Sequence, residues 1–167
     1  GYGDSAIAVF EHMGGPKEKR HDGVARTWRR KTADLNTIAV VCRVDTGANR
    51  LMRPAGLPDD VYQHDGQLTK REVRAITIAA LSPAPGEAMW DVGAGAGSIA
   101  IEFLRAEPTA RAIAIEQNPK RIANIIANGE NLGVRNLNII EGSAPTALKG
   151  LAKPDVIFVG GGVSNAK

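Results

Sequence analysis

A glycine-rich run between an expected strand and an expected helix constrains this chain more than any other feature. The run is Asp91-Val92-Gly93-Ala94-Gly95-Ala96-Gly97-Ser98, and the apolar residues 88–90 come directly before it. Glycine lets the backbone turn sharply and lets a ligand approach where a Cβ atom would obstruct it. A loop of this kind between a strand and a helix is the usual setting of a nucleotide-type site. The run therefore predicts an α/β fold with a ligand at the end of its first strand.

Helix and strand patterns alternate around this run, from residue 67 to the end of the chain. We expect strands over 88–92, 112–115, 137–140 and 156–159, and helices over 69–81, 98–106 and 119–132. Strands separated by helices imply right-handed crossovers and a parallel sheet. We predict a Rossmann-like fold of which the first four strands are present and the C-terminal part is missing, so that the chain is a fragment of a longer protein.

The first of these helices carries two local signals. Thr69 and Glu72 have the spacing of a capping box, in which each side chain bonds to the backbone N–H of the other residue. A helical apolar stripe follows, made of Val73, Ile76, Ala80 and Leu81, and we expect it to face the core.

The first 50 residues have a different pattern. Ser5–Met13 reads as a short helix that stops at Gly14-Gly15-Pro16, and the β-branched residues of 35–42 predict a strand. Residues 17–31 hold seven Lys or Arg, which fits either a solvated loop or a patch for an anionic partner. We expect a short α/β remnant of a preceding domain over 1–52, an exposed linker over 53–60 and the Rossmann-like domain over 61–167.

Charge and cysteine content exclude several classes of protein. The net charge is only +3, with a single cysteine, so we predict no nucleic-acid partner, no disulfide framework and no metal site. No apolar run reaches the roughly 18 residues of a membrane helix, and we predict no membrane partner. We expect a reducing, cytoplasmic compartment, and a homo-oligomer is compatible with the sequence.

The spacing and charge of the glycine run favour one cofactor over another. A dinucleotide-binding loop would have its third glycine at position 98, whereas here it is Gly97. Asp91 would repel a pyrophosphate and attract a ligand that carries an ammonium and a sulfonium. We therefore predict S-adenosylmethionine rather than NAD, and tight NADH binding would reverse that choice.

Two later segments fit the same ligand, and a third fits its substrate. Glu116 ends the second expected strand, where a carboxylate can accept hydrogen bonds from both ribose hydroxyls. The small residues of Glu141-Gly142-Ser143-Ala144-Pro145 would let an adenine ring lie against the backbone after the third strand. Gly160-Gly161-Gly162, after the fourth, would leave room for a bulky substrate.

From about Leu57 onward, the chain resembles the precorrin methyltransferases of cobalamin biosynthesis. The segments that carry this resemblance are 58–60, 68–74, 91–98, 114–119 and 141–145. Leu68-Thr69-Lys70-Arg71-Glu72-Val73-Arg74 is the most specific of them. The first 45 or so residues resemble the end of a tetrapyrrole methyltransferase domain of another fold, an arrangement similar to the fused, decarboxylating members of the family.

The resemblance implies an S-adenosylmethionine-dependent enzyme that methylates carbon atoms of a precorrin macrocycle and decarboxylates an acetate side chain. The positions that match the cofactor site are Thr69, Gly93, Ala94, Gly95, Ala96, Gly97, Glu116 and Ala144. In this reading the glycine loop holds the methionine part, Glu116 the ribose and Ala144 the adenine, and Thr69 closes over the cofactor. The catalytic residues are not identified by the resemblance.

Two further groups are candidates for the tetrapyrrole side of the site. Lys70, Arg71 and Arg74 would form a basic rim for the substrate's carboxylates, or would simply be solvated. His64-Asp65 would be an acid–base pair that assists decarboxylation, or an incidental pair in a loop. A methyltransferase for RNA or protein, and a cofactor-binding module without activity, remain as alternatives.

Overall fold

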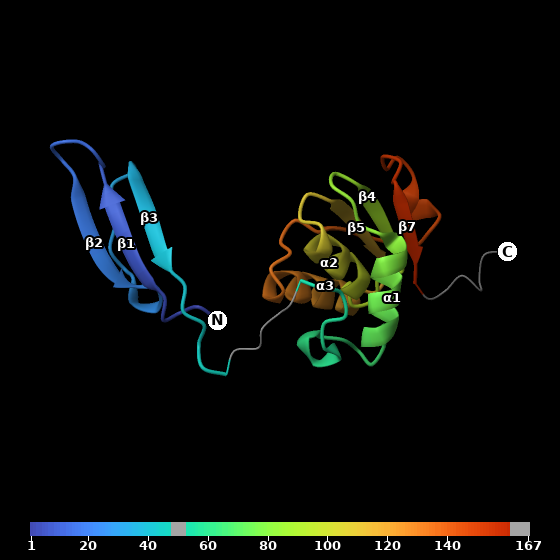
Figure 1. The fold of residues 1–167 in the computed structure, drawn as a ribbon. Coiled ribbons are helices and arrows are strands. Elements are labelled where there is room, and N and C mark those ends of the chain that lie inside the picture. Colours follow the sequence, from blue (N-terminus) through green and yellow to red (C-terminus); the bar gives the residue numbers. More distant parts are fainter. Residues whose placement is uncertain (48–52, 161–167) are drawn as a thin grey trace. The chain divides into compact units, whose positions relative to one another are not determined.

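The computed structural model describes residues 1–47 and 53–160. The chain divides into two compact units, Gly1–Arg50 and Leu51–Lys167 (Figure 1). Within the described ranges, no helix combines the length and the apolar character needed to cross a membrane.

The first unit is a three-stranded antiparallel sheet. Its strands are β1 (Ala6–Glu11), β2 (Lys19–Val24) and β3 (Asn36–Val41), in the order β2-β1-β3. The strand expected over 35–42 is confirmed as β3, but the helix predicted over Ser5–Met13 is wrong, because β1 occupies that segment. Short apolar runs fit either structure, and here cross-strand pairing on both sides of β1 selects the strand.

Part of the basic segment 17–31 forms a strand, β2, rather than a loop. Gly14-Gly15-Pro16 lies in the turn between β1 and β2, with Gly14 at φ +78° and the Gly15 N–H donating to the His12 carbonyl. β2 then pairs along the whole of β1, from Glu11↔Lys19 to Ala6↔Val24. A short 3-10 turn, Ala25–Thr27, follows it.

The second unit confirms the predicted parallel sheet. Its strands are β4 (Ala88–Val92), β5 (Arg111–Glu116), β6 (Asn138–Glu141) and β7 (Val156–Val159), all parallel, in the order β6-β5-β4-β7. Along the chain, β5 pairs with one side of β4 and β6 pairs with the far side of β5. Strand β7 then pairs with the other side of β4, so the direction of the strand order reverses there. In such a sheet, ligands bind beyond the carboxyl ends of the strands at the point of reversal.

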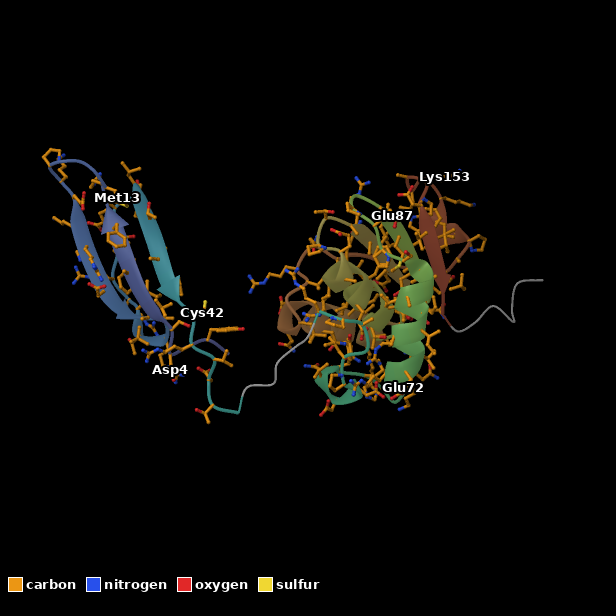
Figure 2. The ribbon with its side chains drawn as sticks, in the orientation of Figure 1. Asp4, Met13, Cys42, Glu72, Glu87 and Lys153 are labelled. Atoms are coloured by element: carbon orange, nitrogen blue, oxygen red, sulfur yellow. The ribbon has the colours of Figure 1, made fainter. Side chains whose placement is uncertain are left out.

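Three helices cover one face of this sheet (Figure 1). They are α1 (Arg71–Leu81), α2 (Ser98–Ala106) and α3 (Pro119–Asn131), and short 3-10 turns lie at Asp59–Val61 and Thr146–Leu148. The predicted start of α3 is confirmed, since the Asn118 side chain accepts from the Lys120 N–H and Pro119 is the first helical residue. Polar side chains such as Glu72 and Lys153 lie on the surface (Figure 2).

Helix α1 differs from its prediction in two respects. It begins at Arg71, and its N-cap residue Lys70 makes no side-chain capping bond, so the predicted capping box is wrong. Val73 and Ile76 of the predicted core stripe are 52% and 70% exposed. The residues that α1 buries are Arg74 and Ile78, because the core accepts a paired arginine at this position.

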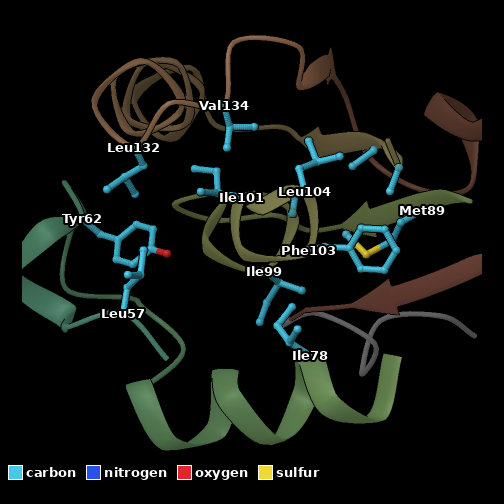
Figure 3. Close-up of a cluster of buried hydrophobic side chains, with 13 residues drawn as sticks. Leu57, Tyr62, Ile78, Met89, Ile99, Ile101, Phe103, Leu104, Leu132 and Val134 are labelled. Carbon is cyan, nitrogen blue, oxygen red and sulfur yellow. The ribbon is translucent and has the colours of Figure 1, made fainter. Parts of the chain in front are cut away.

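The core of the second unit forms around α2, which is buried from Ser98 to Leu104 (Figure 3). The predicted linker contributes to it. Gly56 and Leu57 are buried, and Leu57 packs with Tyr62, Ile78 and α2. The expected exposure of segment 53–60 is therefore wrong at Gly56 and Leu57.

Candidate functional site

The glycine loop turns tightly from β4 into α2. Gly93, Gly95 and Gly97 all have positive φ values, of 74°, 59° and 75°. A Cβ atom on Gly97 would collide with Ile125 of α3, whereas one on Gly95 would meet nothing within 4 Å. The loop thus rests against α3 at Gly97 and presents bare backbone to open space at Gly95.

Glu116, the last residue of β5, holds this loop from one side. Its carboxylate is 4% exposed and accepts the Gly95 N–H at 2.8 Å through Oε2. Oε1 accepts the N–H groups of Gln117 and Asn118, both at 3.0 Å. A carboxylate has about four acceptor positions, so three protein bonds leave Glu116 able to accept one more.

Asn128 of α3 holds the same loop from the other side. Its side chain is fully buried, and Nδ2 donates to the Ala96 carbonyl at 3.0 Å and to the Gln63 carbonyl at 2.9 Å. Oδ1 accepts the Gln63 N–H at 2.7 Å. Asn128 therefore joins the glycine loop to the segment that precedes α1.

Asp91 lies beneath the loop and is the one buried side chain of the described residues with an unpartnered polar atom. It is 1% exposed, and Oδ2 accepts the Ala100 N–H at 3.1 Å while Oδ1 has no partner. Burial raises the pKa of Asp91 to about 7, and the nearby Glu116 adds to this shift. An acceptor is thus available here for a positively charged group.

The ends of β6 and β7 complete the edge. The Gly142 N–H donates to the Glu116 carbonyl at 3.0 Å, and Ala144 follows as an exposed residue. The Gly160 N–H donates to the Val92 carbonyl, and a Cβ atom on Gly160 would collide with the Gly93 carbonyl oxygen. Gly161 and Gly162, predicted to leave room for substrate, lie outside the described residues.

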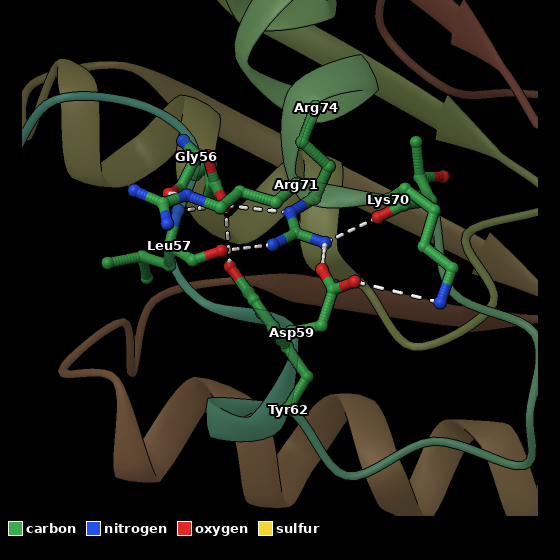
Figure 4. Close-up of polar contacts among 9 residues, drawn as sticks. Gly56, Leu57, Asp59, Tyr62, Lys70, Arg71 and Arg74 are labelled. Atoms are coloured by element: carbon green, nitrogen blue, oxygen red, sulfur yellow. Dashed lines mark hydrogen bonds and ion pairs between the residues drawn. The ribbon is translucent and has the colours of Figure 1, made fainter.

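Arg74 does not belong to a basic rim, which corrects the prediction for this residue. Its side chain is fully buried and donates to Glu102 through Nε at 2.8 Å. Through Nη1 it donates to Asp59, also at 2.8 Å (Figure 4). It also donates to the carbonyls of Leu57 and Thr69. Burial opposes its charge, but the bonds to Glu102 and Asp59 raise its pKa, and Arg74 holds the pKa of Asp59 below the usual range.

Glu102 is the centre of this buried network. It accepts from the N–H groups of Gly56 (2.5 Å) and Leu57 (3.1 Å), from the Tyr62 hydroxyl (3.1 Å) and from Arg74. Burial and the charge of Glu102 raise the pKa of Tyr62, whose ring lies 4.8 Å from the Arg74 guanidinium carbon. The network fixes segment 56–62 and the Thr69 carbonyl to α1 and α2.

The remaining candidates lie on the surface of this segment. Lys70 is 3.7 Å from Asp59, and Arg71 donates to the Gly56 carbonyl (Figure 4). No bond joins His64 to Asp65 in the described part of the chain. Asp65 instead accepts from Arg121 at 2.7 Å, and this bond lowers its pKa.

Sequence reasoning missed Arg74, Glu102 and Asn128 as a buried polar set. For two of them, the sequence itself indicates a buried polar residue. Glu102 is the one acid within the otherwise apolar run Ile99–Leu104, and Asn128 lies three positions after Ile125 on the buried face of α3. A polar residue on a buried helical face requires a hydrogen-bond partner, although neither pattern says which partner.

Comparisons with known proteins point to one family. Residues 60–167 match the family model of the precorrin methyltransferase domain. The chain is 47% identical over 165 residues to a precorrin-6Y C(5,15)-methyltransferase (decarboxylating) from Sinorhizobium sp., covering 98% of this chain and 40% of the relative. It is 43% identical over 168 residues to the protein of the same name from Mycobacterium tuberculosis, covering 98% and 41%.

A solved structure shows the same fold. The C-terminal domain of precorrin-6Y C5,15-methyltransferase from Rhodobacter capsulatus superposes with a TM-score of 0.63 at 42% identity, covering 67% of this chain and 60% of that one. The present chain spans about two fifths of the length of the curated relatives above.

Proposed function

Because this chain belongs to the precorrin methyltransferase family, we propose that the edge of the sheet at the carboxyl ends of β4, β5 and β6 binds S-adenosylmethionine. We further propose that the protein is a precorrin-6Y methyltransferase of cobalamin biosynthesis, which methylates carbon atoms of the macrocycle and decarboxylates an acetate side chain. The names of the relatives support the substrate, and the unpartnered Asp91 oxygen beneath the glycine loop is the observation that carries the cofactor.

The residues at this edge of the sheet fit this cofactor. The loop from Gly93 to Gly97 presents bare backbone, Glu116 retains one acceptor position for a ribose hydroxyl, and Asp91 is an acceptor for the methionine ammonium. Ala144 is exposed next to Gly142 and would lie against the adenine. Thr69, held at its carbonyl by Arg74, would close over the cofactor from the N-terminal end of α1.

When bound, the cofactor supplies an electrophilic methyl group to an electron-rich carbon of the macrocycle. This chain's own contribution is alignment and exclusion of water, since such a displacement disperses charge and needs no strong base. The glycine loop, fixed by Glu116 and Asn128, would orient the cofactor. Lys70, which is exposed, is the candidate for a substrate carboxylate.

A reducing, cytoplasmic location belongs to the same proposal, supported by the single cysteine of the chain. The predicted lack of a nucleic-acid partner is supported by the low net charge. An RNA gel shift that survives moderate salt would contradict it, since nonspecific phosphate contacts weaken steeply with salt.

Calorimetry with S-adenosylhomocysteine tests the site, and E116Q is the sharpest variant. We expect E116Q to weaken binding about 10- to 100-fold, because hydrogen bonds to a charged acceptor contribute about 1.5–3 kcal/mol. E141Q is the matched control, since Glu141 is the exposed residue paired with Glu116 across the ladder. Equal affinities of E116Q and E141Q would contradict the assigned role of Glu116.

Turnover by the full-length protein tests the reaction. Transfer of labelled methyl to a precorrin, with release of carbon dioxide, is the expected result. Cofactor binding without either product would instead indicate a binding module, and transfer to RNA or to a protein side chain would indicate one of the other methyltransferase classes.

A further inference from the structure

The glycine loop is clamped at two consecutive residues by side chains from different elements. Glu116 accepts the Gly95 N–H, and Asn128 donates to the Ala96 carbonyl. These two bonds restrain the loop backbone at both residues. Glu116 lies at the end of β5 and remains able to bind a ligand, whereas Asn128 is fully buried and cannot touch one.

Asn128 also binds the segment before α1 as a backbone strand would. It accepts the Gln63 N–H and donates to the Gln63 carbonyl, so both polar groups of that residue are paired with one side chain. Asn128 thereby uses both its donors and one acceptor position in bonds to the protein backbone. A shift of the Gln63 segment would therefore be transmitted to the Ala96 carbonyl through a single rigid amide.

The neighbouring contacts support the same loop position. Gly97 packs against Ile125, one turn before Asn128 on the same face of α3. Arg121, one turn further toward the start of the helix, binds Asp65 and Gln67 on the same preceding segment. One face of α3 thus supports the loop and the segment together.

We infer that Asn128 is a positioning residue that sets cofactor affinity by holding the glycine loop and the Gln63 segment in fixed relation. The inference rests on the proposed cofactor site. Its distinguishing consequence is that Asn128, although fully buried, alters cofactor binding more than an equally destabilising change elsewhere in the core. A purely structural asparagine would lower the melting temperature and leave the affinity of the folded protein unchanged.

Calorimetry of the full-length protein with S-adenosylhomocysteine separates these roles. N128D keeps the size of the side chain but places a carboxylate oxygen against the Ala96 and Gln63 carbonyls, and we expect its Kd to rise at least tenfold. L104A, a core truncation in the last turn of α2, matches the loss of stability, and N131D matches the change of charge at an exposed position of α3. Both controls should bind within twofold of wild type at a temperature where all variants are folded.

Hydrogen exchange in the wild-type protein gives a second readout that needs no folded variant. Binding of S-adenosylhomocysteine should slow exchange of the Gln63 amide, which is bonded to Asn128, at least fivefold more than that of the Leu57 amide, which is bonded to Glu102. Equal slowing at both amides, or an N128D affinity within twofold of wild type, overturns the inference alone. Wild-type protein that binds no S-adenosylhomocysteine overturns the proposed function, and this inference with it.

Discussion

Two buried carboxylates of the second unit, Glu102 and Asp91, have opposite surroundings. Glu102 accepts from two backbone N–H groups, a tyrosine hydroxyl and an arginine. Asp91 accepts one backbone N–H and leaves an oxygen unpartnered. A saturated buried charge holds segments together, whereas an unsaturated one costs stability unless a ligand completes it. The first carboxylate is therefore structural, and the second is the one that the proposed cofactor site would use.

Replacement of Arg74 should destabilise the protein more than any other change proposed here, because it breaks the network around Glu102. In R74M, Glu102 loses its charged donor and Asp59 loses its buried partner, so we expect the free energy of unfolding to fall by about 3–5 kcal/mol. Urea denaturation measures this loss. R71M is the control, because exposed Arg71 gives one bond to the Gly56 carbonyl and should cost about 1 kcal/mol or less. Equal losses in the two variants would show that Glu102 does not depend on Arg74.

The unsaturated carboxylate should be visible as a pH dependence of stability. Because the pKa of Asp91 is raised from 3.8 to about 7, the folded state between these values keeps a proton that the unfolded chain has lost. Stability from this group is therefore present at low pH and lost as the pH rises through 7. D91N lacks the effect, so the difference between wild type and D91N should change by up to about 4 kcal/mol over this window.

Chemical denaturation from pH 4.5 to 8 covers most of that window and should show about 3 kcal/mol of the difference. Parallel curves for the two proteins would rule out a raised pKa. The cofactor adds a second test of the same residue. If the methionine ammonium completes the pairing of Asp91, D91N should also weaken S-adenosylhomocysteine binding above pH 7, where the wild-type carboxylate is ionised.

Features that depend on neighbouring residues can be predicted from the sequence, whereas features that depend on distant residues cannot. β4, α2 and β7 occupy the expected residues, because apolar patterns and the glycine loop act over a few neighbouring positions. The orientation of α1 was mispredicted because Arg74 is paired with Glu102, 28 positions away. No local pattern reveals that partner, and the predicted apolar stripe at Val73 and Ile76 is exposed instead.

The candidate site shows the same division. The glycine loop and Glu116 could be placed at one sheet edge, since carboxyl ends of parallel strands meet there. The clamp by Asn128 could not, because it depends on how α3 packs against the Gln63 segment, 65 positions earlier. Likewise, β1 is a strand because it pairs with β2 and β3, and its own composition fits a helix equally well.

A smaller change tests whether saturation of Glu102 is complete. Y62F removes one of its four donors and keeps the aromatic ring that contacts Arg74. We expect a loss of about 1 kcal/mol, typical of one buried hydrogen bond, measured by urea denaturation. A loss as large as that of R74M would mean that the tyrosine, rather than the arginine, holds the network together.

The smallest effect is expected at Thr69, where the backbone rather than the side chain belongs to the network. Arg74 donates to the Thr69 carbonyl, and α1 has no side-chain cap. T69A keeps that carbonyl, so we expect the free energy of unfolding to change by less than about 0.5 kcal/mol, whereas loss of a real N-cap would cost about 1 kcal/mol. Calorimetry on the same variant asks whether the hydroxyl reaches the cofactor. A Kd for S-adenosylhomocysteine that rises severalfold at unchanged stability would assign Thr69 to the site, and an unchanged Kd would leave the network as its only role.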